Sequence, residues 1–237
     1  MADKITLYTN HRCPWAHRAH IALAELGVPF EEVIIDLDRP RDPWYLEVNP
    51  RGLVPSLKYG DEIVTESAIV SQFLADLFPE KASLVPASNA AGGPLARARI
   101  AFFVDTYFSK VHSHVNKLGQ AKTEADQAAV GEAIVAAAVK ELEPLLAGST
   151  SADKPFFGGS EKLTLAEVLT GSFVLRLVRL TKSGVYPAGV PAAAASQAPA
   201  FWAWAQAVAA HPSVTGIFNE EAVTASTKKR LATQRAA

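Results

Sequence analysis

One residue of this chain combines a nucleophilic side chain with a position that would activate it. Cys13 is the only cysteine among 237 residues, and it directly precedes Pro14 between a short predicted strand and a predicted helix. Proline is tolerated at the first helical position because its missing N–H would have no partner there. A thiol at a helix N-terminus faces unpaired N–H groups and the positive end of the helix dipole, which favour the thiolate. Arg12, His17 and Arg18 add positive or protonatable groups, so Cys13 is predicted to be catalytic rather than an inert buried residue.

The lone thiol also limits the redox chemistry that the chain can carry out. A thioredoxin-type Cys-x-x-Cys pair would need a second cysteine at position 16, where the chain has Ala16. A mixed disulfide on Cys13 must therefore be resolved by a thiol from outside the chain, and glutathione is the abundant cellular one. Because no internal disulfide can form, we expect a reducing compartment and a cytoplasmic location.

Composition argues against several other classes of function. The chain holds 23 Lys and Arg against 24 Asp and Glu, so no basic excess indicates a nucleic-acid partner. No apolar run reaches the roughly 20 residues of a membrane helix, and no signal-type segment opens the chain. His112 and His114 are two positions apart on a predicted helix and face different ways, so no metal site is expected.

The elements around Cys13 alternate between strands and helices. Residues 5–8 alternate apolar and polar side chains, which is typical of a short strand. The apolar run inside 32–37 predicts a strand buried on both faces, as in parallel sheets. In chain order the predicted elements are strand 5–8, a helix from Pro14 to a stop at Gly27, strand 32–37, a loop or broken helix over 38–50, strands 54–57 and 62–64, and helix 66–78. The first part is therefore an α/β unit of the form βαβ–ββα.

The remainder of the chain has helical periodicity. Thr164 and Glu167 have the spacing of a capping box in front of an apolar run. The Pro- and Ala-rich segment 183–198 is predicted to be a long loop. Helices are predicted over 95–118, 125–146, 165–180, 201–210 and from 219 toward the end of the chain. We therefore expect three parts: a domain over 1–80, a linker over 81–94 and an all-α domain over 95–237.

Four segments resemble one known family. Residues 13–18 (CPWAHR) resemble the Cys-Pro-Phe/Trp-Ala-x-Arg active-site motif of cysteine-type, omega-like glutathione transferases, and are also similar to glutathionyl-hydroquinone reductases. Residues 49–55 (NPRGLVP) resemble the Asn-Pro-x-Gly-x-Val-Pro segment of the superfamily. Residues 65–69 (TESAI) resemble its Glu-Ser turn, and residues 163–167 (LTLAE) its capped helix. The resemblance implies a thioredoxin-like domain that binds glutathione and a helical domain that binds a second substrate.

The same resemblance assigns roles at the glutathione site. Cys13 is implied to be the thiolate that meets the glutathione sulfur, and Val54 to offer its backbone to the cysteinyl part. Pro55 is implied to be cis. Glu66 and Ser67 are implied to hold the γ-glutamyl end, where the ammonium needs a carboxylate and the carboxylate needs donors.

Further assignments follow from where residues fall in the predicted elements. The resemblance matches Arg41 to a basic residue of the middle loop that binds glutathione, and Trp15 is expected to line the site or pack beneath it. For the second-substrate pocket we expect Trp15 together with Phe108, His112 and Trp202, although Trp202 and its neighbour Trp204 also fit a core or an interface.

The implied activity is glutathione-dependent thioltransfer or reduction through a mixed disulfide between Cys13 and glutathione. Substrates expected from this chemistry are glutathionylated proteins, small disulfides, dehydroascorbate and quinone adducts. The family also implies a homodimer. A non-enzymatic ligand-binding or regulatory protein of the same fold is the alternative, and stoichiometric binding without turnover would favour it.

Overall fold

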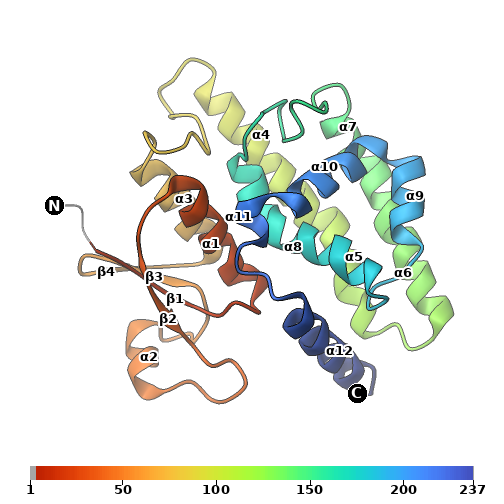
Figure 1. Ribbon diagram of the computed structural model, residues 1–237, viewed down its shortest axis with the longest axis horizontal. Coiled ribbons are helices and arrows are strands. Elements are labelled where there is room, and N and C mark those ends of the chain that lie inside the picture. The colour runs from red at the N-terminus through yellow and green to blue at the C-terminus, as the bar shows by residue number, and fades with distance from the viewer. Residues whose placement is uncertain (1–3, 237) are drawn as a thin grey trace.

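A computed structural model describes residues 4–236 of the chain (Figure 1). Its N-terminal part holds a four-stranded sheet with the strand order β2-β1-β3-β4. β1 (Ile5–Thr9) runs parallel to β2 (Glu31–Ile34) and antiparallel to β3 (Ser56–Tyr59), which pairs with β4 (Glu62–Thr65) in a hairpin. This mixed order places the C-terminal end of β1, and therefore the loop that carries Cys13, in the middle of the sheet.

Three helices accompany the sheet. α1 (Pro14–Leu26) and α3 (Ser67–Leu77) pack against each other, whereas the short α2 (Pro43–Val48) lies on the opposite side of the sheet (Figure 1). α1 ends at Gly27, whose φ of 58° lies in the left-handed region that glycine adopts without steric cost. The predicted stop at Gly27 is confirmed.

The predicted burial of the second strand on both faces is wrong. β2 is an edge strand, and its residues are exposed or only half-buried, with Ile34 54% exposed. In the apolar run Val33-Ile34-Ile35, only Ile35 is fully buried, while Val33 is half-buried and Ile34 is exposed. Ile35 is buried in a small cluster with Ala16, Tyr45 and Val54.

The second part of the chain is helical, as predicted. The stretch expected as one helix over 95–118 is a continuous rod with a π-helical section at Tyr107–His112, and the one over 125–146 has a similar section at Ala138–Leu142. The helices are α4 (Gly93–Thr106), α5 (Ser113–Val115), α6 (Glu124–Ala137), α7 (Glu143–Leu146), α8 (Leu165–Lys182), α9 (Val190–Gln197), α10 (Pro199–Ala210), α11 (Pro212–Thr215) and α12 (Glu220–Ala236), with a 3₁₀ turn at Asn116–Gly119.

The long loop predicted over 183–198 is wrong in its second half. α9 occupies Val190–Gln197, with Pro191 in its first turn, where a proline lacks only an N–H that has no helical partner. Four consecutive alanines follow, and alanine has the highest intrinsic helix propensity. Val190 and Ala194 are buried, so packing holds the short helix in place.

α8 is the central helix of the molecule. It packs against α1 and α3 of the first part and against α4, α10 and α11 of the second, and nearly all of its residues are buried. The capping box at its start is confirmed, because the Thr164 hydroxyl accepts from the helix and Glu167 accepts from the Thr164 N–H at 2.9 Å. One hydrophobic cluster continues through both parts of the chain. Within residues 4–236, no helix combines the length and apolarity that crossing a membrane requires.

Candidate functional site

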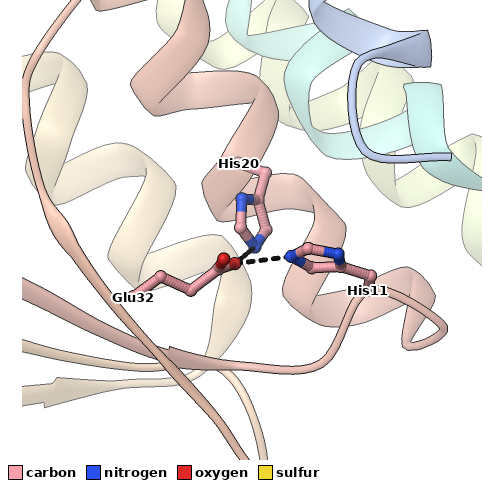
Figure 2. Close-up of side chains that lie close together, drawn as sticks. All are labelled: His11, His20 and Glu32. Carbon is pink, nitrogen blue, oxygen red and sulfur yellow. Dashed lines mark hydrogen bonds and ion pairs between the residues drawn. The ribbon is translucent and has the colours of Figure 1, made fainter.

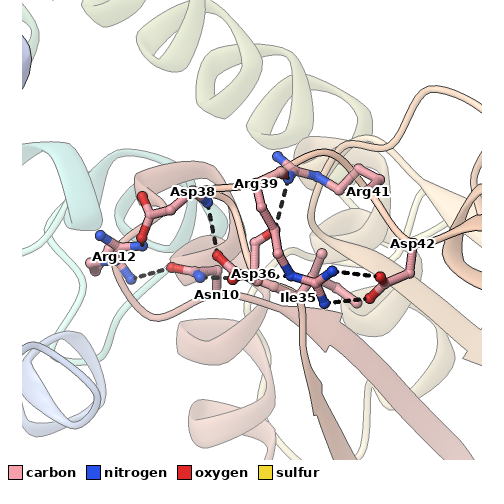
Figure 3. A network of polar contacts seen from close by, with 8 residues as sticks. All are labelled: Asn10, Arg12, Ile35, Asp36, Asp38, Arg39, Arg41 and Asp42. Carbon is pink, nitrogen blue, oxygen red and sulfur yellow. Dashed lines mark hydrogen bonds and ion pairs between the residues drawn. The ribbon is translucent and has the colours of Figure 1, made fainter.

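Cys13 is the N-cap residue of α1, as the sequence predicts. Its backbone is extended, its N–H donates to the carbonyl of Asn10 at 3.0 Å, and its own carbonyl accepts from the N–H of His17 at 3.1 Å. The Asn10 side chain braces this turn: its amide donates to the Ile35 carbonyl at 2.9 Å, and its oxygen accepts from the Arg12 N–H at 3.0 Å (Figure 3). The half-buried thiol is thus fixed at the start of a helix, where the dipole favours a negative charge.

The sulfur borders a hollow of about 430 Å³, which we call the first hollow. Its volume lies within the range of small-molecule sites, roughly 300–1,000 Å³. The structure brings together here every residue that the resemblance assigns to glutathione. These residues are Cys13, Trp15, Arg41, Val54, Pro55, Glu66 and Ser67.

The loop before β3 presents its backbone to this hollow. The Val54–Pro55 bond is cis, as the resemblance implies, and the sulfur of Cys13 lies 4.0 Å from the Val54 carbonyl oxygen. The carbonyl of Leu53 is held by the Tyr45 hydroxyl at 2.6 Å and by the Asn49 amide at 2.9 Å. These bonds fix the loop, so Val54 can pair with an extended peptide-like ligand without rearrangement.

The opposite wall is the start of α3. Glu66 has a φ of 69°, a conformation that side-chain-bearing residues rarely adopt and that often marks a functional turn. Its carboxylate is half-exposed and pairs with Arg51 at 2.5 Å. The turn directs the free N–H groups of α3 and the buried hydroxyl of Ser67 toward the hollow. An anionic group bound here would meet these donors, and an ammonium group would meet the Glu66 carboxylate.

Arg41 lines the hollow from the loop after β2, and its donors are largely occupied by backbone carbonyls. It donates to Gly52 at 2.9 Å, to Asp36 at 2.7 Å and to Arg39 at 2.6 Å. A two-bond pair between Arg39 and Asp42, at 2.7 and 2.8 Å, braces the same loop (Figure 3). Arg41 therefore holds the loop in place beside the hollow, in addition to lining it.

Arg18 belongs to the site in a way that the sequence reading missed, because there it counted only as a nearby charge. The side chain is buried and donates to the Ser67 hydroxyl at 3.0 Å and to the Leu169 carbonyl at 2.7 Å. The guanidinium lies 4.6 Å from the ring centres of both Trp15 and Phe108. Burial lowers the pKa of Arg18 to about 9, which leaves it cationic at neutral pH. One side chain thus ties α1 to α3 and α8 and orients Ser67.

We expect Arg18→Met to raise the KM for glutathione about tenfold, since it removes the charge-assisted bond that orients Ser67. It should also lower stability by roughly 3 kcal/mol, because the buried Leu169 carbonyl and the aromatic rings lose their partner. Steady-state kinetics and urea unfolding measure the two effects. The control is Arg99→Met, which changes an exposed arginine of α4. A KM equal to that of the control would contradict the role of Arg18.

A second hollow of about 370 Å³ lies on the other side of Trp15. Arg12, Pro14 and Trp15 form one wall, so the second hollow adjoins the loop that carries Cys13. The opposite wall comes from the helical part of the chain. It consists of His112, Val115, Asn116, Phe173, Arg176, Leu177, Tyr186, Val223, Ser226, Thr227 and Arg230.

Of the four residues assigned to the second-substrate pocket, Trp15 and His112 line this hollow. Phe108 lies beneath Trp15 with a ring separation of 5.5 Å and borders a different hollow with it, so it supports the wall from behind. Trp202 is removed from the set: it is buried in the core on α10 and lines neither hollow, which agrees with its reading as a core residue. Trp204 is buried as well.

The sequence reading also missed most of the far wall. The helix predicted from 219 is α12, and no role at the site was expected of it, yet its residues Val223, Thr227 and Arg230 close the second hollow. Arg176 and Tyr186 lie far from Cys13 in the sequence and carry no motif. The one sequence signal for this wall is the four-residue spacing of Val223 and Thr227, which places both side chains on the same face of the predicted helix. Such a face is expected to pack against another part of the protein.

His11, His20 and Glu32 form a polar cluster beside the loop that carries Cys13 (Figure 2). The Glu32 carboxylate lies 2.6 Å from His11 Nε2 and 3.3 Å from His20 Nε2, and the Thr9 hydroxyl lies 2.9 Å from the same His20 nitrogen. All three possible metal-ligand atoms lie within 4.8 Å of one another. These are hydrogen-bonding distances, and the cluster links β1, α1 and β2 around the turn before Cys13.

We expect His20 to make the protein less stable in acid. Burial lowers the pKa of His20 from 6.5 to about 4. Between these pH values the His20 side chain is protonated in the unfolded chain and neutral in the folded chain. Stability is therefore complete above pH 6.5 and falls as the pH drops toward 4, by roughly 2 kcal/mol at pH 5 from this group. Urea unfolding at pH 7 and pH 5 measures the loss. His20→Gln should reduce it, the exposed control Lys4→Gln should not, and equal losses in all three proteins would refute the assignment.

The fold and site together define a thioredoxin-like domain joined to a helical domain, with a ligand hollow at the junction of a cis-proline loop and a helix start. Comparison with known proteins agrees. The family model described as "Glutathione S-transferase, N-terminal domain" matches residues 12–77. Together with two relatives described next, which are more than 30% identical over at least two thirds of their length, this match shows that the chain belongs to the glutathione S-transferase family.

Three similar proteins illustrate the range of the family. The chain is 33% identical over 160 residues to glutathione S-transferase U22 of Arabidopsis thaliana, covering 67% of each protein. It is 32% identical over 180 residues to glutathione S-transferase omega-1 of Rattus norvegicus, covering 75% of this chain and 68% of that one. The crystal structure of glutathione transferase Omega 2C from Trametes versicolor is 30% identical, with a TM-score of 0.78 over 97% of this chain and 99% of that one. The omega-like resemblance and the predicted fold class are confirmed.

Proposed function

We propose that this protein is a cysteine-type, omega-like glutathione transferase that acts as a thioltransferase or reductase through Cys13. The observation that carries the proposal is the position of the single thiol. It caps α1 at the edge of a hollow whose other walls are the Val54–Pro55 loop and the Glu66–Ser67 turn. The family uses glutathione, and the first hollow is the place where these residues would bind it.

The chemistry proceeds by two thiol–disulfide exchanges. In the first, the thiolate of Cys13 attacks the glutathione sulfur of a substrate R–S–S–G, forms a Cys13–S–S–G disulfide and expels R–S⁻. In the second, the thiolate of a free glutathione attacks the glutathione sulfur of this mixed disulfide, releases oxidised glutathione and restores Cys13. The chain has no second cysteine that could attack the Cys13–glutathione disulfide, so only an external thiol such as glutathione can reduce it.

Arg176 supports the anionic steps from the helical part. Its guanidinium donates to the carbonyl of Arg12 at 3.1 Å and to that of Ser172 at 2.9 Å. Burial lowers the pKa of Arg176 to about 10, while the proximity of Cys13 and Tyr186 acts in the opposite direction. The side chain is therefore a cation at neutral pH, buried beside the residue that precedes the nucleophile. His17, also buried, packs against it.

The experiment that tests the proposal traps the intermediate. Protein incubated with oxidised glutathione, acid-quenched and analysed by mass spectrometry should gain the mass of one glutathionyl group, located on the Cys13 peptide. Added reduced glutathione should remove the adduct. Absence of the adduct, or an adduct that glutathione does not release, would refute the mechanism and leave the ligand-binding alternative.

A homodimer completes the proposal, since proteins of this family are commonly dimers. Three large apolar side chains on two neighbouring helices are more than half exposed: Ile69 on α3, and Leu95 and Phe102 on α4. α3 and α4 are joined by the Asp76–Arg97 ion pair, so these side chains lie on adjacent elements. We expect a dimer by light scattering and a monomer for Phe102→Glu, with the exposed Lys110→Glu as control. An unchanged dimer for Phe102→Glu would show that this face is not the interface.

A further inference from the structure

The second hollow has an unusual balance of charge. Among residues 4–236, three arginines line it and no aspartate or glutamate does. The three arginines come from separate elements: Arg12 from the loop before α1, Arg176 from α8 and Arg230 from α12. The cations therefore converge on one space instead of following one another along a single surface helix.

Two of the three arginines lack a carboxylate partner within the described residues. Arg12 is paired with Asp38 at 2.5 Å, so its charge is compensated. Arg176 donates to the carbonyls of Ser172 and Arg12 and lies 3.4 Å from His17 Nδ1, and no carboxylate of residues 4–236 lies within 4.0 Å of it. Arg230 donates to the side-chain oxygen of Gln234 at 3.3 Å. A buried cation without a counter-ion is costly, and a bound anion would offset that cost.

The other ionisable groups at this hollow are neutral at physiological pH. Burial, reinforced by the charges of Arg18 and Arg230, lowers the pKa of His112 to about 4. Burial raises the pKa of Tyr186, against the opposing charges of Arg230 and Arg176. No side chain in the wall therefore brings a negative charge that would neutralise Arg176 and Arg230 before a substrate arrives.

The remaining wall is apolar and aromatic. The rings of Trp15 and Phe173 lie 4.6 Å apart edge to face, and His112 packs on Phe173 at 4.8 Å. Trp15 is 44% exposed, a large apolar surface for a side chain next to the nucleophile. A flat ring can stack on this wall while a charged substituent reaches the arginines.

We propose that the second substrate is an aromatic compound that carries a carboxylate or a comparable anionic group, bound with its ring against Trp15 and Phe173 and its anion between Arg176 and Arg230. This inference rests on the proposed function, because it places the leaving group R of the R–S–S–G substrate in the second hollow. It goes further by naming the charge and shape that the enzyme selects. A neutral aromatic of the same size would lose the interaction with both arginines.

The test compares two substrates that differ in charge: the mixed disulfides of glutathione with 4-mercaptobenzoate and with 4-mercaptobenzamide. Each rate is divided by that of the uncatalysed reaction with glutathione, which corrects for the different leaving groups. We expect an about tenfold lower KM for the carboxylate, the size of a charge-assisted bond. Arg230→Met should reduce the ratio of the two KM values by about threefold, because solvent weakens the interaction of an exposed arginine with the carboxylate. Arg176→Met, which removes the buried cation, should make the two KM values equal. Lys228→Met, an exposed change on the same helix, should leave it intact.

A binding measurement separates this inference from the proposed function. Cys13→Ser protein is titrated calorimetrically with S-(4-carboxybenzyl)glutathione and with its carboxamide, neither of which requires turnover. Tighter binding of the carboxylate, weakened by Arg230→Met, supports the anion site. Equal affinities for the carboxylate and the carboxamide would overturn the inference even where thioltransfer is observed. So would a loss of carboxylate affinity in Lys228→Met as large as that in Arg230→Met. Carboxylate-selective binding without any Cys13-dependent turnover of the disulfides would instead overturn the proposed function and retain the anion site.

Discussion

Cys13→Ser is expected to abolish the reduction of hydroxyethyl disulfide by glutathione, with a loss on the order of 1,000-fold or more in kcat/KM. Serine has nearly the same shape as cysteine and would preserve the turn from Asn10, so the structure should not change. Its hydroxyl, however, remains protonated at neutral pH and cannot form a disulfide. The coupled assay follows the oxidised glutathione produced.

The same substitution should affect a second reaction in the opposite direction. Conjugation of glutathione to an electrophile such as 1-chloro-2,4-dinitrobenzene needs a hydroxyl that stabilises the glutathione thiolate, and Cys13 occupies the place of that hydroxyl. We expect low conjugation by the natural protein and a gain for Cys13→Ser. Tyr8→Phe is the control, since the Tyr8 ring packs on Trp44 and Tyr45 and its hydroxyl has no part in the proposal. An unchanged reductase rate in Cys13→Ser would disprove nucleophilic catalysis by this thiol.

Glu167→Ala is expected to have the largest effect on stability. The Glu167 side chain is fully buried and accepts hydrogen bonds from four donors in three segments. These donors are the N–H of Phe157 at 2.8 Å, the N–H and hydroxyl of Thr164 at 2.9 and 2.7 Å, and the indole N–H of Trp204 at 2.8 Å. Removing the carboxylate leaves buried donors without partners and also breaks the capping box of α8, in which Glu167 accepts from the Thr164 N–H. We expect a loss of about 4 kcal/mol or more in the free energy of unfolding.

Urea unfolding measures this loss of stability, and two further variants serve as comparisons. Glu167→Gln keeps the shape of the side chain but replaces one acceptor oxygen by an NH₂ donor, so its free energy of unfolding should fall somewhat less than that of Glu167→Ala. Glu161→Ala, an exposed change just before the helix, should be neutral. Since α8 carries Leu169, Phe173 and Arg176 to the two hollows, Glu167→Ala should also raise the KM for glutathione before it unfolds the protein. A neutral Glu167→Ala would show that the buried network is not what holds α8.

The fold class, the position of Cys13 at a helix start and the residues around the first hollow could be predicted because short contiguous patterns in the sequence carry them. A proline directly after a cysteine, a glycine at a helix end and a capping box each act within one turn of chain, and each is found where it was predicted. The segments at 49–55 and 65–69 are contiguous motifs that resemble a known family, and the residues which that resemblance assigns to glutathione all line one hollow. The division into domains at 80 and 94 stays a prediction.

What failed or was missed depends on contacts between distant segments. The burial of β2 is decided by its place at the sheet edge, which no run of apolar residues within the strand encodes. α9 forms because Val190 and Ala194 find a packed surface, which outweighs the loop-like composition around them. Arg18, Arg176 and Arg230 join the site only when α1, α8 and α12 are brought together.

The sequence alone therefore placed Cys13 at a helix start and named the residues that line the first hollow, because short contiguous motifs carry both. Only the tertiary structure decided the second hollow, where α12 closes over Trp15 and two arginines lie without carboxylate partners among residues 4–236. The physical reason is that the electrostatic potential and the burial at a point depend on every charge and atom around it, and most of those lie far away along the chain.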